Sequence, residues 1–488
     1  MTLRDWWREH KHDLRTVITV EPLTFLFTIS LFLTFPASQA LYIQKLCLAK
    51  YKDDVICNNL SAYHVQQDYV QTETSRFFLY SISVDTLLAM GSALFMGSWG
   101  DKINRKIPMI LPITGQILAN VNYFINSFNP DWPVPMLLIS PVFAGTMGGF
   151  ATYLLSVFSY VSVVSQGAKE RIIRLSITEG ILQLGAAVAL VISGPLVERL
   201  GFSVTFGVSV ASATLSLLYT VFWIRDPAVK TKNTGDEGEE KKRSLCSKLF
   251  DCSHIIESVK CYFKVRKGYR RFVLWSCLVI FMVIMVTLGG SFDISLLFLR
   301  YSIPNWTLTL YGIYTGLKNA LQMLGLLVIL PLFKRFLALE DTSLVIIGQV
   351  SSVLGQVLLA FSNTVWMVML VPFAGMLSGL SSAALRSIVA KMVGPDEQGK
   401  AFAFLGCAQA LSILMASLIF NNLYPATLHF LPGLSYLICA LFTVAVMALT
   451  IVMRCYMPVE ETTNTQDDQT LDKSALVMGI EETEQYMA

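Results

Sequence analysis

Charged side chains interrupt several long apolar stretches of this 488-residue chain, and they are the residues best suited to chemistry. A carboxylate in such a setting can bind and release a proton. A lysine or arginine there can hold the carboxylate of a ligand or of another helix. Charge inside a membrane-spanning helix is costly and usually functional. The candidates are Asp85 in SISVDTLLAMG, Glu179 in RLSITEGILQLGAA, Asp293 after VTLGGSF, Lys318 in YGIYTGLKNALQMLG and Arg386 in SSAALRSIVAKMV.

Two of these candidates have a simple structural alternative. Glu179 stands early in its apolar run, where it would serve as a helix-start acid and pair with Arg171 or Arg174. Arg386 is followed closely by Lys391, so its long side chain would reach the cytoplasmic surface instead of a ligand. The sequence leaves both interpretations open beside the functional ones.

The other candidates depend on partners that the sequence does not place. Lys318 lies deep in its run, and a mid-helix lysine needs a counter-charge, which an anionic substrate or Asp293 would supply. Asp85 is a similar case in an earlier run. Asp293 is alternatively a residue at the edge of a loop. Glu21, just before a proline, is expected to serve the start of the first helix.

The composition indicates which elements position these charges. Hydrophobic residues make up 54% of the chain and charged residues 15%, whereas soluble proteins carry about 25% charged residues. The mean hydropathy is +0.57. Many apolar blocks approach the ~20 residues of a membrane-spanning helix, and lipid leaves the backbone no partner but itself. The sequence therefore predicts an all-α membrane protein, whose first block, VITVEPLTFLFTISLFLTF, is too long for a signal peptide.

The apolar blocks predict twelve transmembrane helices in two six-helix halves, separated by a long charged segment. Such an arrangement is typical of secondary transporters. The predicted division is a cytoplasmic N-terminus at 1–16, an N-terminal half at 17–224, a cytoplasmic central loop at 225–271, a C-terminal half at 272–455 and a disordered acidic cytoplasmic tail at 456–488.

Lysine and arginine predict the topology, because basic loops stay in the cytoplasm. The basic gaps alternate with gaps that lack these residues, which places both termini in the cytoplasm. The exceptions are Lys45, Lys50 and Lys52 in the first outer gap, and Arg199 and Arg300 in two others.

The outer gaps carry candidate sites of covalent modification. The tripeptides at Asn59 and Asn305 have the N-glycosylation pattern, and both fall in predicted outer gaps. Of the nine cysteines, Cys47 and Cys57 are those that map to the oxidising side, so a disulfide between them is a candidate.

The gap GSWGDKINRK, between the second and third predicted helices, resembles the loop signature Gly-x-x-x-Asp-x-x-Gly-Arg-Arg of the major facilitator superfamily. Gly97, Asp101, Arg105 and Lys106 match it, and Asn104 replaces the second glycine. Asparagine tolerates the left-handed conformation. The resemblance implies a conformational latch, in which the acid faces Arg105 or the start of a neighbouring helix. The alternative is a positive-inside topology signal with an incidental acid.

The chain also resembles solute carrier family 46, the family of the proton-coupled folate transporter. The similarity is densest in DEQGKAFAFLGCAQALSILMASLIFNNLYPATLHFLPG, and VEPLTFL, SRFFLY and GDKINRKIPMIL fit as well. This resemblance implies that Glu179 is the proton-coupling glutamate, that Arg386 is the arginine of the tenth helix, and that Asp293 corresponds to an aspartate of the folate transporter. Lys318 has no clear counterpart.

Several positions depart from the folate transporter. Thr287 stands where that protein has a histidine, and none of the five histidines lies inside a predicted span, so a proton relay would rest on carboxylates. Phe150 and Val164 occupy the acidic positions of the fourth helix. A cysteine is missing from YSIPNW, which excludes a Cys57 bridge to that loop. These losses favour a sibling that carries another organic anion.

The functional prediction is a proton-coupled symporter of an organic anion, folate-like or a related small molecule, that works by alternating access. Its substrate site is expected at mid-membrane between the halves, on helices one, four, five, seven, eight and ten. No nucleotide-binding or hydrolase motif occurs, so we expect a proton gradient in place of a cofactor, no metal and no enzyme activity. The expected surroundings are a plasma or lysosomal membrane, without nucleic acid, with the chain as a monomer.

The alternative is a membrane receptor or sensor that keeps the carrier fold but transports nothing. The family acids that are missing from this chain motivate it, and binding without counterflow would favour it.

Overall fold

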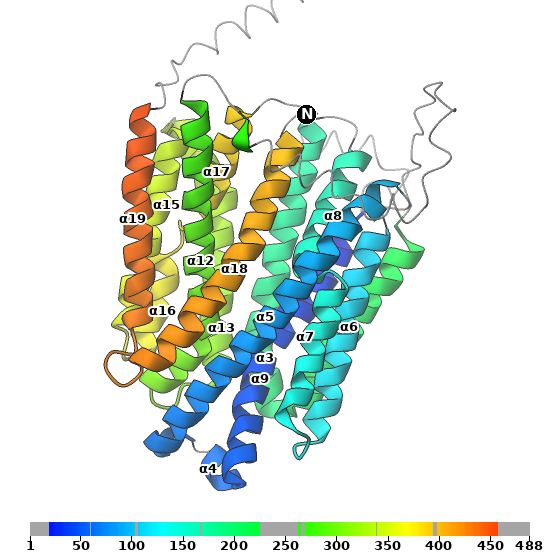
Figure 1. The fold of residues 1–488 in the computed structure, drawn as a ribbon, viewed down its shortest axis with the longest axis vertical. Helices are drawn as coiled ribbons and strands as arrows, with labels where there is room; N and C mark the ends of the chain where they lie inside the picture. The colour runs from blue at the N-terminus through cyan, green and yellow to red at the C-terminus, as the bar shows by residue number, and fades with distance from the viewer. Residues whose placement is uncertain are drawn as a thin grey trace, which may run out of the picture.

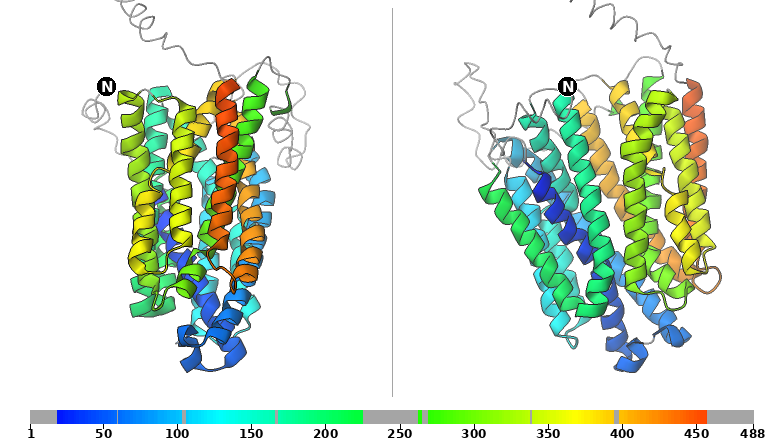
Figure 2. Two further views of the ribbon diagram at one scale, coloured as in Figure 1. Left: turned by 90° about the vertical axis from the view of Figure 1, so that its left-hand side faces the viewer. Right: turned by 180° about the vertical axis from the view of Figure 1, so that it is seen from behind.

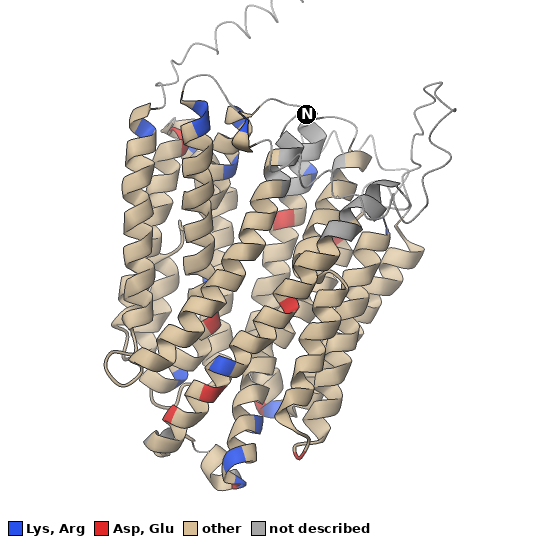
Figure 3. Ribbon diagram, in the orientation of Figure 1, with Lys and Arg blue, Asp and Glu red and all other residues tan. Residues whose placement is uncertain are grey.

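The computed structural model describes residues 19–58, 60–102, 106–165, 168–224, 262–264, 269–337, 339–393 and 398–456. Every regular element in these ranges is a helix. Long helices run side by side along one axis, and the first described residues and the end of α19 lie at the same end of the bundle (Figures 1 and 2). Figure 3 shows lysines and arginines mainly near the two ends, with long uncharged stretches between them.

The N-terminal half is built from the helices before the central segment. They are α3 (Glu21–Tyr51), α4 (Asp54–Asn58), η1 (Leu60–Ala62), α5 (His64–Lys102), α6 (Ile107–Phe128), η2 (Val134–Leu138), α7 (Ile139–Thr146), α8 (Gly149–Val164) and α9 (Ala168–Phe222). The length of α9, 55 residues, would be about 80 Å if straight, far more than the ~30 Å of a bilayer core. Gly201, with φ 86°, divides it into two crossings, because glycine adopts this conformation without strain.

The C-terminal half contains the remaining helices. They are α12 (Arg270–Ser302), α13 (Leu308–Leu324), the π-helical η4 (Gly325–Ile329), α14 (Leu330–Phe336), α15 (Asp341–Ala360), α16 (Val365–Ala374), α17 (Gly379–Met392), α18 (Gln398–Thr427) and α19 (Leu434–Tyr456). The segments α13, η4 and α14 follow one another without a gap and form one crossing. The pair α16 and α17 forms another.

The predicted architecture of twelve crossings in two halves is confirmed. Among the described residues, nine helical segments are long and apolar enough to cross a membrane, and one of them, Ile177–Phe222, contains the Gly201 division. The remaining two crossings are α5 and α6, which run alongside the others in Figure 1. The predicted terminal segments, except residue 456, and most of the predicted central loop lie outside the described residues.

Lys45, which the sequence placed in the first outer gap, and Asp293, for which a loop edge was the alternative to a site in a helix, both lie inside helices. Lys45 belongs to α3, which continues to Tyr51, and its ammonium donates to Asn126 Oδ1 at 3.1 Å and to the Asn129 carbonyl at 2.8 Å. The end of α6 thus satisfies this lysine at the end of the bundle that the charge pattern predicts to be the outer one, here named the outer end, opposite the predicted cytoplasmic end. Asp293 lies well within α12 and is 4% exposed, so the loop-edge interpretation was wrong.

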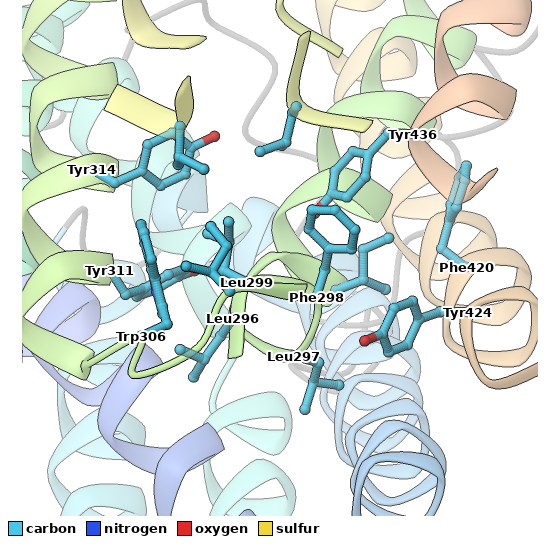
Figure 4. Packing of buried hydrophobic residues seen from close by; sticks show 14 of the residues in the cluster. Leu296, Leu297, Phe298, Leu299, Trp306, Tyr311, Tyr314, Phe420, Tyr424 and Tyr436 are labelled. Carbon is cyan, nitrogen blue, oxygen red and sulfur yellow. The ribbon is translucent and has the colours of Figure 1, made fainter. Parts of the chain in front are cut away.

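The hydrophobic clusters show where the two halves meet. One cluster joins Ala40, Ile43, Cys47 and Val70 of the N-terminal half to α12, α13, α18 and α19 of the C-terminal half (Figure 4). Each of the three other clusters lies within one half. The cluster that contains Val20 belongs to the N-terminal half, and the one that contains Met453 belongs to the C-terminal half. Apolar packing therefore closes the bundle at the outer end, while each half has a core of its own at the cytoplasmic end.

Candidate functional site

An ion pair joins the two halves. Glu179, on α9, lies 3.7 Å from the guanidinium of Arg386, on α17, measured from Oε1 to Nη1. The two side chains are 50% and 40% exposed, so a ligand or a proton can reach them. The guanidinium also lies 5.9 Å from the ring centre of Phe281, which favours a cation there. Arg386 was expected either to pair with a carboxylate or to reach the cytoplasmic surface. In the structure it contacts an acid of the other half.

A set of hydrogen bonds that the sequence did not reveal closes the outer end. Glu198, at the outer end of the first crossing of α9, accepts hydrogen bonds from the backbone N–H groups of Leu308 and Thr309 and from the Thr309 hydroxyl. These groups belong to the first turn of α13, in the other half, whose positive dipole end favours a carboxylate. Thr307 also caps this helix by accepting from the Leu310 N–H at 3.1 Å.

Asp293 belongs to a second junction between the halves. Its carboxylate accepts a hydrogen bond from Asn421 Nδ2 at 3.3 Å, and its backbone carbonyl accepts one from Gln39 Nε2 at 3.1 Å. Ser75, on α5, donates to the carbonyl of the same asparagine at 2.9 Å. Asp293 forms no ion pair with Lys318 within the described part of the chain. The structure therefore places this aspartate in a contact between helices rather than beside a cation.

Lys318 lines a cavity inside the C-terminal half. The cavity has a volume of about 70 Å³ and lies among α12, α13, α15, α16, α17 and α19. Tyr314, Lys318 and Gln322 face it from α13, at the spacing of one helix face. Thr287, the position at which the family resemblance leads one to expect histidine, lines the same cavity. Sequence reasoning identified the lysine but not the cavity, because its walls come from six helices.

Asp85 lies in the N-terminal half. Its Oδ1 is buried and has no hydrogen-bond partner among the described residues. The helix α5 packs closely against α7 at this point, because a Cβ added to Gly145 of α7 would lie 2.5 Å from the backbone carbonyl oxygen of Asp85. Within the described part of the chain, the Asp85 carboxylate forms no ion pair with Lys318 or with Arg386.

The predicted latch is only partly visible. Gly97 and Asp101 lie in α5, but the side chain of Asp101, like the whole of Arg105, falls outside what the structure describes. Lys106 directs its ammonium to the Val221 carbonyl at 3.5 Å. The C-terminal half contains a contact of the predicted kind, between an acid and basic residues. There Asp341 binds Lys334 at 3.1 Å, Lys391 at 3.2 Å and the Ser387 hydroxyl at 2.8 Å. The two lysines had indicated topology, but their shared acid was not foreseen.

The outer end carries the candidate modification sites. Cys47 and Cys57 form a disulfide with Cα atoms 5.7 Å apart. Asn305 is exposed, with φ 56°, in the turn before α13. Asn59 lies outside the described residues. Within the described ranges, no group of three or more His, Cys, Asp or Glu residues could hold a metal ion.

Comparison with known proteins connects this geometry to a family. Residues 22–416 match the sequence profile of the Major Facilitator Superfamily. The chain is 26% identical to the lysosomal proton-coupled steroid conjugate and bile acid symporter of Gallus gallus, over 88% of this chain and 92% of that protein. It is 28% identical to the proton-coupled folate transporter of Bos taurus, over 86% of this chain and 88% of that one. The predicted resemblance to solute carrier family 46 is confirmed.

Solved structures share the fold at low identity. The human organic anion transporter MFSD10 aligns with a TM-score of 0.60 at 12% identity, covering 88% of this chain and 98% of that one. A POT family transporter in complex with 5-aminolevulinic acid aligns with a TM-score of 0.61 at 14% identity, covering 90% and 96%. From its sequence profile over most of its length and its two-half helical architecture, the chain belongs to the major facilitator superfamily.

Proposed function

We propose that the chain is a proton-coupled symporter of organic anions that works by alternating access, and that Glu179 is its proton-coupling residue. The observation that carries the proposal is the ion pair between Glu179 and Arg386, which come from opposite halves and remain half-exposed. A charge pair across the moving interface can link proton binding to the relative position of the halves, because its two states differ in contacts.

The coupling follows from competition for one cation. When Glu179 is ionised, it holds Arg386. When it takes a proton, its charge is lost, and the guanidinium becomes available to the carboxylate or sulfate of a substrate. An anion bound to Arg386 in turn leaves Glu179 without its counter-charge, which favours the protonated form. Proton and anion therefore bind together, as a symporter requires.

The outer contacts supply the second element of the proposal. The contacts of Glu198, Asp293 and the shared hydrophobic cluster all lie toward the outer end, so the described conformation has its outer side closed. Movement of one half against the other is the usual way in which such repeats expose a site alternately. Outward opening would break these contacts and bring the cytoplasmic ends together.

The relatives support the substrate class. Two of them are named for proton-coupled transport, one of folate and the other of steroid conjugates and bile acids. We infer that this chain carries a related organic anion across a plasma or lysosomal membrane as a monomer, with both termini in the cytoplasm. A proton gradient takes the place of a cofactor, and the chain is a transporter rather than an enzyme.

Uptake by the intact chain tests this proposal. Cells with the protein at their surface would be given labelled reduced folate or labelled taurocholate at acidic and at neutral pH. We expect acid-stimulated uptake of at least one of the two anions, and counterflow of the same anion in proteoliposomes. Binding of an anion without any counterflow would contradict transport and would identify a sensor instead.

A further inference from the structure

The cavity around Lys318 is lined by both polar and apolar side chains, and none of its lining residues in the described ranges is an acid. Its charged lining residue is Lys318, and the polar ones include Tyr314, Gln322, Gln349 and Tyr436. The ammonium of Lys318 forms neither an ion pair nor a hydrogen bond within the described part of the chain. Lys318 is partly buried, and a cation that is partly removed from water is costly without a counter-charge, so the site as described has an unmet need for an anion.

Further unsatisfied groups face the same space. Tyr436 is fully buried, and its hydroxyl has no hydrogen-bond partner among the described residues. Tyr314 of α13 and Tyr436 of α19 both line the cavity, and Figure 4 shows them on opposite sides of the hydrophobic cluster. Buried hydroxyl and amide groups normally have partners. A lysine and a tyrosine hydroxyl together are donors of the kind that bind a carboxylate, a sulfate or a halide.

The side chains of Gln322 and Gln349 connect neighbouring helices and, in the described part of the chain, form no hydrogen bond with Lys318 or Tyr436. Gln322 Nε2 donates to Ser378 at 2.8 Å, and Gln349 Nε2 donates to Thr450 at 3.1 Å. These bonds connect α13 to α17 and α15 to α19, so the cavity is fixed by cross-links between helices. These amides are thus bonded to other helices, whereas Lys318 and the Tyr436 hydroxyl have no partner in the described part of the chain.

The size of the cavity limits its occupant. Roughly 10–15 Å³ of such volume holds one water molecule, so a cavity of about 70 Å³ takes a few waters or one small anionic group, but no fused ring system. Leu288, another lining residue, is 53% exposed, so the cavity has an accessible edge.

We propose that this cavity is a binding site for one small anionic group, a carboxylate, a sulfate or a halide, held by Lys318 and Tyr436. The group comes either from the charged end of the transported substrate or from a free ion such as chloride. As an anion site it stands independently of the proposed function. Only its assignment to the substrate rests on that function.

Thermal unfolding of the purified full-length chain tests the site directly. Acetate, chloride and sulfate would each be titrated as probes against the wild-type chain, Lys318→Met and Lys50→Met, in which an exposed outer lysine undergoes the same change. A bound ligand raises the unfolding midpoint in a saturable way. We expect a saturable rise of a few degrees in the wild-type chain and in Lys50→Met, and its loss in Lys318→Met.

A milder variant separates anion binding from folding. Tyr436→Phe removes only the hydroxyl, and we expect it to weaken the affinity for acetate or chloride by about tenfold, since hydrogen bonds to charged groups are strong. Lys318→Met should also unfold at an equal or higher temperature than the wild-type chain in low salt, because it removes a partly buried cation that has no counter-charge in the described part of the chain. Equal anion responses in the wild-type chain, Lys318→Met and Tyr436→Phe would overturn the proposal.

Competition with cholate assigns the source of the anion. If chloride displaces cholate in proportion to its concentration, and Lys318→Met weakens both, the anionic group belongs to the substrate. If chloride leaves cholate binding unchanged or strengthens it, the site holds a free ion. A chain that binds small anions at Lys318 but shows no counterflow would refute the proposed transport and leave the anion site standing.

Discussion

The carboxylate of Glu198 accepts a hydrogen bond from the backbone N–H of Thr309 at 3.1 Å. It thereby connects the outer end of the first crossing of α9 to the first turn of α13 in the other half. The same carboxylate also binds the Leu308 N–H and the Thr309 hydroxyl. A single side chain thus satisfies helix-end donors that would otherwise need water. Opening of the outer side must break all of these bonds together.

Glu198→Gln should therefore favour opening of the outer side. Hydrogen bonds to a charged group contribute about 1.5–3 kcal/mol, enough to shift an equilibrium between two conformations by about tenfold or more. Spin labels at the exposed residues Phe128 and Phe361, at the outer ends of α6 and α15, would report the separation of the halves. We expect a longer distance component in Glu198→Gln. Glu73→Gln, which affects a pair within one helix, serves as the control.

Gly312 is one of the glycines at which α13 packs tightly against α9. A Cβ there would lie 2.3 Å from the Leu190 carbonyl oxygen, which belongs to the helix backbone. Gly312→Ala should destabilise the chain by about 1–3 kcal/mol through overpacking and lower the thermal unfolding midpoint. Gly406→Ala provides the control, because a Cβ at that helical glycine meets nothing within 4 Å. Equal midpoints for the two variants would show that the helices can separate without cost.

Asp341 should matter far more than the acid beside it. It is 8% exposed and binds two lysines and Ser387, whereas Glu340 forms a more exposed pair with Arg454 at 3.3 Å. Its lysines are 47% and 44% exposed and would stay solvated, so loss of the Asp341 carboxylate costs about 1.5–3 kcal/mol, the range of hydrogen bonds to a charged group, whereas an exposed pair contributes at most about 1 kcal/mol. We expect Asp341→Asn to lower the thermal unfolding midpoint clearly and Glu340→Gln to leave it nearly unchanged. A similar decrease in both would contradict this assignment.

The sequence predicted the features that depend on local composition. Apolar runs predicted the crossings, and the charge at Arg386 was recognised as a possible partner for an acid of the other half. The length of α3 was underestimated, because Lys45 was interpreted as a loop residue although Asn126 and the Asn129 carbonyl of a neighbouring helix satisfy it.

Features that depend on the meeting of distant helices could not be predicted. Glu198 sits in a run with no motif, and its importance arises from the first turn of α13 more than a hundred residues later. Lys318 was identified as a mid-helix cation, but its cavity has walls from six helices. Asp341 was not singled out from the sequence, because its lysines come from two other helices, α14 and α17.

The pH dependence of anion flux in Glu179→Gln tests the central claim most directly. In the wild-type chain, acid should stimulate uptake, because protonation removes the charge that holds Arg386. Glutamine imitates the protonated form at every pH, so we expect counterflow to persist while its dependence on pH and any proton-driven accumulation disappear. Glu340→Gln, an acid at the cytoplasmic end of the other half, should keep both. Uptake by Glu179→Gln that still rises in acid as in the wild-type chain would contradict the account.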